Sequence, residues 1–407
     1  MRLRFGSKET RRFLFIPCLR PKSPPRAMGK MSVRRAEQRM RDDRLYPMKQ
    51  FYCECGNTLF FENTLCLRCG RAVGFDLAQN RMRPITEMFP RCRNGTDFGA
   101  CNWIMPSPSA YCLSCRLNRT VPNLSGTHNL EAWRRMERAK RRVVYTLAQL
   151  GIAPLSKAED FKGVAFDFLT PASDLRVITG HQAGVITVNT LEADDYYRER
   201  ERHLLGEPYR TLVGHFRHEM GHYYWDRFFL GLANGDARLT ELRAIFGDER
   251  DDYASALARH YANGPVGTWP STHITGYAAA HPWEDWAETW AHYLHIVDAM
   301  ETTKAFEWKV PDDPLAYALD ASAEPFDETN SDAGFLKTLN GWAALSPALN
   351  EIAASLGHMN LYPFVLSPSA VTKIHFVHKM VTLAAATWPH PTMTPTLSRG
   401  RLEEIAA

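Results

Sequence analysis

The chain has 407 residues, of which 45% are hydrophobic, a composition typical of a globular protein with two or three domains. The sequence contains no run of eighteen or more apolar residues, which excludes a membrane-spanning helix. The net charge of +4 conceals an asymmetry: residues 1–49 carry 15 Lys and Arg against 4 Asp and Glu, whereas the rest carries 34 against 41. This mildly acidic body lacks the dominant basic patch of a nucleic-acid-binding protein.

Residues 1–47 form a basic segment that we expect to be a disordered extension. The residues after Arg11 and Arg12 loosely match a twin-arginine export signal, but Pro17 and Arg20 interrupt the apolar run before it is long enough to act as one. Eight of the nine cysteines are clustered at metal-ligand spacing, which favours a reducing compartment. We therefore predict a cytoplasmic protein.

The cysteine-rich segment 48–120 is predicted to be a double zinc ribbon. Glycines follow two of its cysteines, as in zinc knuckles, where a tight turn lets backbone amides approach the sulfurs. Eight thiolates fit two closed, structural zinc sites, and the cysteines could pair sequentially or in an interleaved order. Cys112 and Cys115 could instead form a redox pair, although no thioredoxin-like βαβ pattern surrounds them. The candidate ligands are Cys53, Cys55, Cys66, Cys69, Cys92, Cys101, Cys112 and Cys115.

A zinc ribbon can bind nucleic acid, dock a protein partner or cover a face of a neighbouring domain. Arginines and aromatic residues are interspersed in this one. That composition permits nucleic-acid contact, but small ribbons also display it for solubility. We favour a structural or protein-docking role.

Downstream of the ribbon, an amphipathic helix is predicted first. Short strand-like runs come after it, and further helical segments come after these runs. A helix is predicted from Asn129 to Leu150, where Gly151 ends it. Turn residues separate the strand-like runs. These runs are 164–169, 175–178 and 185–189, and the later helical segments are 209–229, 253–261, 283–299 and 334–382.

The segment 214–225 contains the pattern HExxH, formed by His218, Glu219 and His222. On a helix, positions i and i+4 share one face, so both imidazoles can bind one zinc ion while Glu219 flanks the open coordination position. Zinc with an open position activates a water, for which the glutamate is the general base. The pattern also arises by chance, but the helical context favours a metal site. Gly221 lowers helix propensity, which indicates a packing requirement at that turn.

The third protein ligand has to come from another segment, because Trp225 and Phe228 stand where a metzincin has glycine and histidine. Glu284 and Glu288 lie one turn apart on the predicted helix 283–299. One of them can ligate zinc while the other hydrogen-bonds a ligating histidine. A solvated acidic helix is the alternative, which the nearby tryptophans disfavour.

These features together resemble a bacterial family of zinc-binding metallopeptidases with an N-terminal zinc ribbon, within the gluzincin clan. The resemblance covers residues 48–385. It implies an α+β fold in which a zincin-like metallopeptidase domain, mostly helical with a small sheet, is preceded by a cysteine-rich zinc-ribbon domain. Its marks are Tyr52-Cys53-Glu54-Cys55-Gly56-Asn57, the HExGHYYW helix, Glu284-Asp285-Trp286-Ala287-Glu288 and Asn360-Leu361-Tyr362-Pro363-Phe364.

On this basis the catalytic domain is expected to span 128–325, with a C-terminal helical part at 326–388. The remaining residues, 389–407, contain several prolines and are expected to form a disordered tail.

The resemblance also implies roles for individual residues. Glu284 is the third zinc ligand, and Glu288, four residues later, orients a zinc-binding histidine. Tyr277 stands seven residues before Glu284, the offset at which a tyrosine faces zinc in some gluzincins, where its phenol would stabilise the oxyanion. A loop aromatic packed on the helix is the alternative for Tyr277.

In zincins, an edge strand upstream of the HExxH helix pairs with the extended substrate. This role is assigned to the last strand-like run before the helix. An interior strand is the alternative, because short apolar runs do not distinguish edge from core. The residues assigned to substrate binding are Gly184, Val185, Ile186, Thr187, Val188 and Asn189.

The sequence thus predicts a zinc metallopeptidase with one catalytic and two structural zinc ions, acting on a peptide or protein and not associated with a membrane. One alternative is a non-catalytic zinc-ribbon protein that binds nucleic acid or a protein partner. A purely structural site would need His218 and His222 but not Glu219. Another alternative is a metal-dependent hydrolase of a non-peptide amide.

Overall fold

The computed structural model describes residues 50–106, 110–172, 177–205, 210–310 and 331–389. The extension expected at 1–47 lies outside these ranges, as does all but the first residue of the tail expected at 389–407. The strand expected at 175–178 lies half outside them. Residues 177–178, which the structure describes, are not part of a strand, so the prediction is wrong for these two residues.

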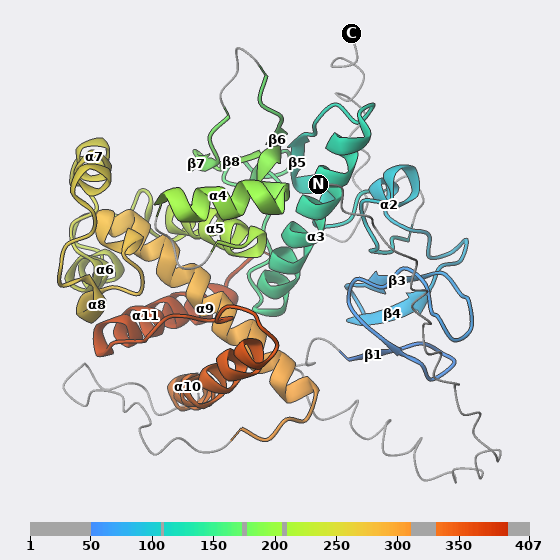
Figure 1. The fold of residues 1–407 in the computed structure, drawn as a ribbon. Helices are drawn as coiled ribbons and strands as arrows, with labels where there is room; N and C mark the ends of the chain where they lie inside the picture. Colours follow the sequence, from blue (N-terminus) through green and yellow to red (C-terminus); the bar gives the residue numbers. More distant parts are fainter. Residues whose placement is uncertain (1–49, 107–109, 173–176, 206–209, 311–330, 390–407) are drawn as a thin grey trace, which may run out of the picture. The chain divides into compact units, whose positions relative to one another are not determined.

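The cysteine-rich part consists of two small antiparallel hairpins and a short helix, coloured blue to cyan in Figure 1. β1 (Phe51–Tyr52) pairs with β2 (Thr58–Leu59), and β3 (Val73–Asp76) pairs with β4 (Arg81–Pro84). α2 (Arg93–Phe98) follows. Strands this short cannot form a stable sheet on their own. The part therefore depends on its cysteine clusters and on the helix against which it packs.

The long helix α3 (Thr127–Gln149) holds the cysteine-rich part in place. Arg141 is buried on α3, and its guanidinium donates a hydrogen bond to the backbone carbonyl of Ala100. The ring of Tyr145 packs edge-on against that of Phe61, with 5.1 Å between their centroids. The amphipathic helix predicted for 129–150 thus covers the ribbon as well as the core that follows.

A four-stranded sheet with the order β5-β6-β8-β7 follows the ribbon. β5, β6 and β8 run parallel, and β7 is antiparallel to β8. β5 belongs to the end of the cysteine-rich segment, so that segment contributes a strand to the sheet of the next domain. The strands are β5 (Asn118–Thr120), β6 (Ala165–Leu169), β7 (Gly180–Gln182) and β8 (Val185–Asn189).

The prediction that Gly184–Asn189 forms a substrate-binding edge strand is wrong. β8 lies between β6 and β7, and Ile186 at its centre is completely buried. Ala183 and Gly184, with φ of 48° and 78°, form the two-residue turn that pairs β7 with β8. Among the described strands, β7 is therefore the edge on this side. Its three residues have no apolar alternation by which the sequence would reveal it.

The rest of the described chain is helical. The helices expected at 209–229, 253–261 and 283–299 correspond to α5, α7 and α9, and the long helical region 334–382 divides into α10 and α11. Three further helices, α4, α6 and the short α8, were not expected. The bounds are η1 (Cys115–Leu117), η2 (Thr190–Ala193), α4 (Asp195–Leu205), α5 (Leu212–Phe229), α6 (Ala237–Phe246), α7 (Tyr253–Asn263), α8 (Trp269–Thr272), η3 (Tyr277–Ala280), α9 (Pro282–Ala305), α10 (Ser331–Ser355) and α11 (Pro368–Ala385).

The helices α5 and α9 pack closely at Gly221, and Figure 1 shows them side by side. A Cβ atom at Gly221 would lie 2.9 Å from the Cα of Ala287, so only glycine allows this approach. The indole of Trp286 donates a hydrogen bond to the carbonyl of Gly221 at 2.9 Å. The packing requirement expected at Gly221 is thus the contact that brings α9 against the HExxH helix.

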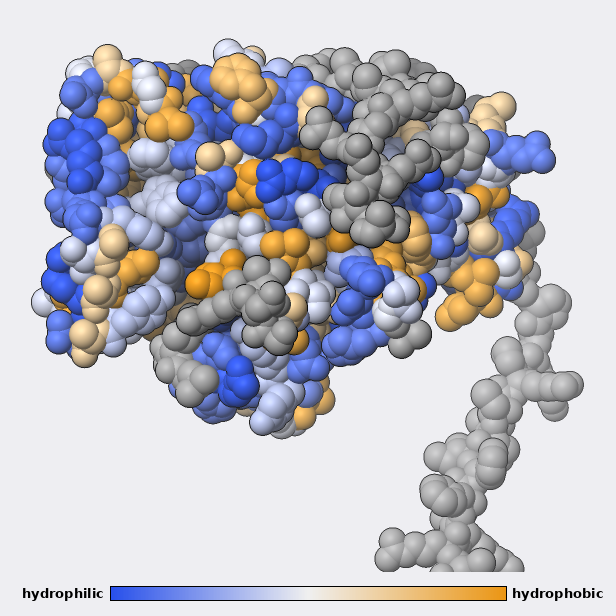
Figure 2. Space-filling view, turned by 90° about the horizontal axis from the view of Figure 1, so that it is seen from above, coloured by the Kyte–Doolittle hydropathy of each residue, from blue (hydrophilic) through white to orange (hydrophobic). Residues whose placement is uncertain are grey.

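The surface of the described part is mixed in polarity. Apolar side chains form small clusters among polar ones on the face drawn in Figure 2. Within the described residues, every helix is too short or too polar to cross a bilayer.

Candidate metal centre

Two histidines of α5 and one glutamate of α9 converge inside the molecule. His218 and His222 lie one turn apart, with their Nε2 atoms 3.2 Å from each other. The Oε2 atom of Glu284 lies 3.0 Å from Nε2 of His218 and 3.4 Å from Nε2 of His222. All three side chains are buried. Thr211 caps α5 and His281 caps α9, so each helix begins shortly before the residues it contributes.

The hydrogen bonds of His218 show that this cluster suits a cation. Glu288 accepts a bond from Nδ1 of His218 at 2.7 Å through Oε1, and accepts one from the hydroxyl of Thr275 at 2.8 Å through Oε2. A proton on Nδ1 leaves a lone pair on Nε2, which faces a carboxylate oxygen and the other imidazole. Three such donor atoms repel one another unless they share a positive ion, and two histidines with one carboxylate are typical of a catalytic zinc site.

The charges in the cluster favour an ionised carboxylate. Burial alone would raise the pKa of Glu284, but His222 and His218 lower this pKa well below its usual value. Burial would likewise lower the pKa of His218, whereas the bonds to Glu284 and Glu288 raise it well above its usual value. Two carboxylates thus face the imidazole of His218, an arrangement that stabilises positive charge at this point.

Glu219 is buried on the same helix as the two histidines. Its Oε2 atom has no hydrogen-bond partner among the described residues. Its charge also contributes to raising the pKa of Tyr253 and of Tyr277, after the larger effects of burial and of Glu284. The carboxylate therefore lies near both tyrosines.

The tyrosine predicted to face the metal lies beside the cluster. The ring of Tyr277, in η3, is 6.0 Å from the ring of His218. A second tyrosine, which the sequence did not reveal, lies closer to a predicted ligand: the hydroxyl of Tyr253 donates a hydrogen bond to Oε1 of Glu284 at 2.6 Å. Tyr253 stands 31 residues before Glu284 in the sequence, and no motif connects the two.

Two rings flank the second histidine. The ring of Trp283 lies 3.7 Å from that of His222, and the ring of His181, in β7, lies 6.3 Å away on the edge strand. Burial is the main reason that the pKa of His181 falls to about 3, so this imidazole is neutral at physiological pH. Neither residue was expected at the site.

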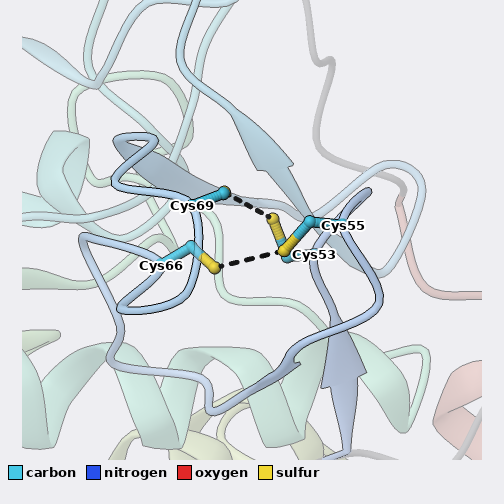
Figure 3. Close-up of side chains that lie close together, drawn as sticks. All are labelled: Cys53, Cys55, Cys66 and Cys69. Atoms are coloured by element: carbon cyan, nitrogen blue, oxygen red, sulfur yellow. Dashed lines mark hydrogen bonds between the residues drawn. The ribbon is translucent and has the colours of Figure 1, made fainter. Parts of the chain in front are cut away.

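The eight cysteines form two groups, and the pairing that the sequence left open is sequential. Within each group the sulfurs lie within 4.8 Å of one another, as four ligands of one metal ion do. In the first group, shown in Figure 3, Sγ of Cys53 is 3.7 Å from that of Cys69, and Sγ of Cys55 is 3.6 Å from that of Cys66. The first group is Cys53, Cys55, Cys66 and Cys69, and the second is Cys92, Cys101, Cys112 and Cys115.

The turns around the sulfurs match those expected of zinc knuckles. Gly56 and Gly70 have φ of 79° and 71°, a conformation that favours glycine. The backbone amide of Cys69, with a further contribution from that of Arg68, lowers the pKa of Cys66 to about 6, which favours the thiolate. The second group is fully buried, whereas Cys69 of the first is exposed.

Two family models match the chain. The model described as "putative zinc-binding metallo-peptidase" matches residues 129–380, and a zinc-ribbon domain model matches residues 50–126. The chain belongs to this zinc-binding metallo-peptidase family. The resemblance to a zinc-binding metallopeptidase family with an N-terminal zinc ribbon is thus confirmed, as is the fold class, with a cysteine-rich ribbon before a mostly helical domain that carries a small sheet. Membership of the gluzincin clan stays a prediction.

Relatives occur in mycobacteria. Proteins of Mycobacterium bovis and of Mycobacterium tuberculosis are each 39% identical over 359 residues, which covers 86% of this chain and 99% of theirs. Both are described as uncharacterized. No solved structure matches the chain significantly. Membership in the zinc-binding metallo-peptidase family therefore rests on the family models.

Proposed function

We propose that this member of the zinc-binding metallo-peptidase family hydrolyses peptide bonds, with zinc held by His218, His222 and Glu284. The convergence of these three donor atoms, with the buried carboxylate of Glu219 on the same helix, is the observation that carries the proposal. Three protein ligands leave a coordination position for water, which distinguishes a catalytic zinc site from a closed structural one.

Zinc bound in such a site lowers the pKa of a coordinated water to about 7 and so supplies a nucleophile near neutral pH. Glu219 would accept a proton from the attacking water and then deliver it to the leaving amine. Tyr277 donates a hydrogen bond to the oxygen on which charge develops. Glu288 holds His218 in the tautomer that presents Nε2, and Thr275 in turn holds Glu288.

A substrate could align along β7, in place of the interior strand that the sequence suggested. An edge strand offers unpaired backbone groups with which an extended peptide can form hydrogen bonds. β7 packs against α5, and its His181 lies 6.3 Å from the ring of His222. A peptide added to this edge would pass close to the donor cluster.

The ribbon is better suited to a structural role than to binding nucleic acid. Five of its arginines form ion pairs within the chain, and two zinc ions each held by four thiolates would add negative charge to it. Little free positive charge is then left for phosphate contacts. The paired arginines are Arg71 with Glu54, Arg83 with Asp76, Arg93 with Asp97, Arg116 with Glu159 and Arg119 with Asp167.

A panel of internally quenched peptides tests the proposal. The purified chain should cleave members of the panel, lose this activity under mild chelation and recover it when zinc is added back. A panel of non-peptide amides, run in parallel, identifies the alternative substrate class. Cleavage that persists unchanged in the chelated protein, or a zinc-loaded protein that cleaves only the non-peptide amides, would contradict a zinc peptidase.

A further inference from the structure

Tyr253 is the first residue of α7 and lies against the metal cluster. Its hydroxyl donates a hydrogen bond to Oε1 of Glu284 at 2.6 Å. Its ring packs edge-on against His281 and Trp283, with centroids 5.3 Å from each. Asp252 caps α7 by accepting a hydrogen bond from the amide of Ser255, which fixes where the helix begins. Ring and hydroxyl are thus both held in place.

The two oxygens of Glu284 have different surroundings. Oε2 faces His218 and His222, whereas Oε1 is bonded to Tyr253. A carboxylate beside a metal can bind through one oxygen or through both. The hydrogen bond from Tyr253 directs Oε1 towards the start of α7, while Oε2 is the oxygen that faces the two histidines.

The same tyrosine also connects two ligands through packed rings. The ring of Trp283 lies 3.7 Å from that of His222. The ring of Tyr253 packs against Trp283 and also against His281, at the start of α9. Tyr253 thus contacts Glu284 directly and His222 through Trp283. Hydrogen-bonding partners of metal ligands orient those ligands and affect metal affinity and activity.

We propose that Tyr253 is a positioning residue that keeps Glu284 bound to the metal through a single oxygen and so preserves an open coordination position. The inference rests on the metal site of the proposed function, not on the identity of its substrate. If Oε1 were released, Glu284 could bind through both oxygens, and the position needed by water would be filled.

Tyr253→Phe tests the inference, because it removes the hydroxyl and keeps the ring that packs against Trp283. Tyr261→Phe is the matched control, since Tyr261 is an exposed tyrosine of the same helix. The full-length proteins would be treated with a mild chelator that removes only the accessible metal. Zinc affinity of that site would then be measured by competition with a chromogenic chelator.

Tyr253→Phe should weaken zinc binding by roughly 10–100-fold, as the loss of a ligand's hydrogen-bond partner does, while Tyr261→Phe leaves it unchanged. Cobalt added to the emptied site gives a second readout, because the visible absorption of cobalt changes when a carboxylate oxygen replaces a water ligand. The visible spectrum of the cobalt form of Tyr253→Phe should therefore differ from that of the wild type. A merely structural role for the tyrosine would change neither readout while the protein remains folded.

Equal zinc affinities and equal cobalt spectra for Tyr253→Phe and the wild type would overturn the inference. A wild type without chelator-sensitive zinc would overturn it together with the proposed function. A wild type that binds zinc but cleaves no peptide would contradict only the proposed function, and the affinity difference at Tyr253 would still support the positioning role.

Discussion

The amino group of Lys373, on α11, donates a hydrogen bond to Oδ2 of Asp285 at 2.6 Å, and both side chains are buried. Asp285 is the neighbour of Glu284 and the nearest competitor for the role of third ligand. Consecutive positions on a helix point about 100° apart. Asp285 therefore pairs with α11, while Glu284 faces the histidines of α5.

Paired substitutions separate these two carboxylates. Glu284→Gln should remove the chelator-sensitive zinc and abolish activity. Asp285→Asn should retain that zinc but lower the free energy of unfolding by about 3 kcal/mol, because it leaves the buried charge of Lys373 unpaired. Zinc content and urea unfolding measure the two effects. If Asp285→Asn lost the chelator-sensitive zinc and Glu284→Gln kept it, the third ligand would be Asp285 and not Glu284.

Tyr277→Phe should leave zinc bound and lower kcat by about 100-fold or more, as the loss of one donor to a developing oxyanion does. Zinc content and single-turnover cleavage of a peptide substrate would measure the two quantities. The alternative, that Tyr277 only packs against the helix, predicts an unchanged kcat in a folded, zinc-loaded protein.

Gly221→Ala should destabilise the protein, because the added Cβ would lie 2.9 Å from the Cα of Ala287 and force α5 and α9 apart. Overpacking of this kind costs about 1–3 kcal/mol, and the displaced α9 should also bind zinc less tightly through Glu284. Gly235→Ala is the control, since no atom lies within 4 Å of its added Cβ. Thermal unfolding of the two variants would compare them, and equal midpoints would refute the close contact.

Stability should depend on pH through His292. Burial lowers the pKa of His292 to about 4 from 6.5, only partly opposed by the charge of Glu288. The unfolded chain therefore takes up a proton below pH 6.5 that the folded chain does not accept until about pH 4. The contribution of His292 is fully present above pH 6.5 and is lost as pH falls towards 4, by up to about 1.4 kcal/mol per pH unit.

Urea unfolding at pH 7.5 and 5.5 measures this effect in the wild type and in His292→Gln. The wild type should lose about 1.4 kcal/mol more than the variant between the two pH values. Acid release of zinc affects both proteins and cancels in the comparison. Equal losses would show that His292 titrates normally in the folded protein.

Local patterns predicted much of the cluster before the fold was known. His218 and His222 are neighbours because a helix repeats every 3.6 residues, so their spacing alone places them together. Glu284 and Glu288 follow the same rule on α9. The structure places these four side chains close together.

Other features depend on contacts between distant segments, which no local pattern encodes. Tyr253 reaches Glu284 only because α7 packs against the start of α9. β8 is an interior strand because β7 pairs with it through a turn at Ala183 and Gly184. A short apolar run does not indicate whether a strand lies at the edge or in the interior of a sheet. The end of the ribbon forms β5 because it pairs with β6, across the expected domain boundary.

The unexpected helices α4 and α6 differ in how clearly their sequences indicate a helix. α4 is dominated by charged residues and is supported by local ion pairs such as that between Arg202 and Glu199, so it has little apolar periodicity to detect. α6 has the local features of a helix: Asp236 caps it, and Leu239, Leu242 and Phe246 share one buried face.

The substitution Glu219→Gln tests the central claim, zinc-dependent peptide hydrolysis, most directly. It removes the general base while leaving the donor atoms of the metal site and all eight cysteines in place. Elemental analysis should find about three zinc ions in both the wild type and the variant, two of them resistant to mild chelation. The wild type should cleave peptides, and the zinc-loaded variant should not. A variant that cleaves as fast as the wild type, or a wild type that holds only the two resistant zinc ions, would contradict the assignment of this site.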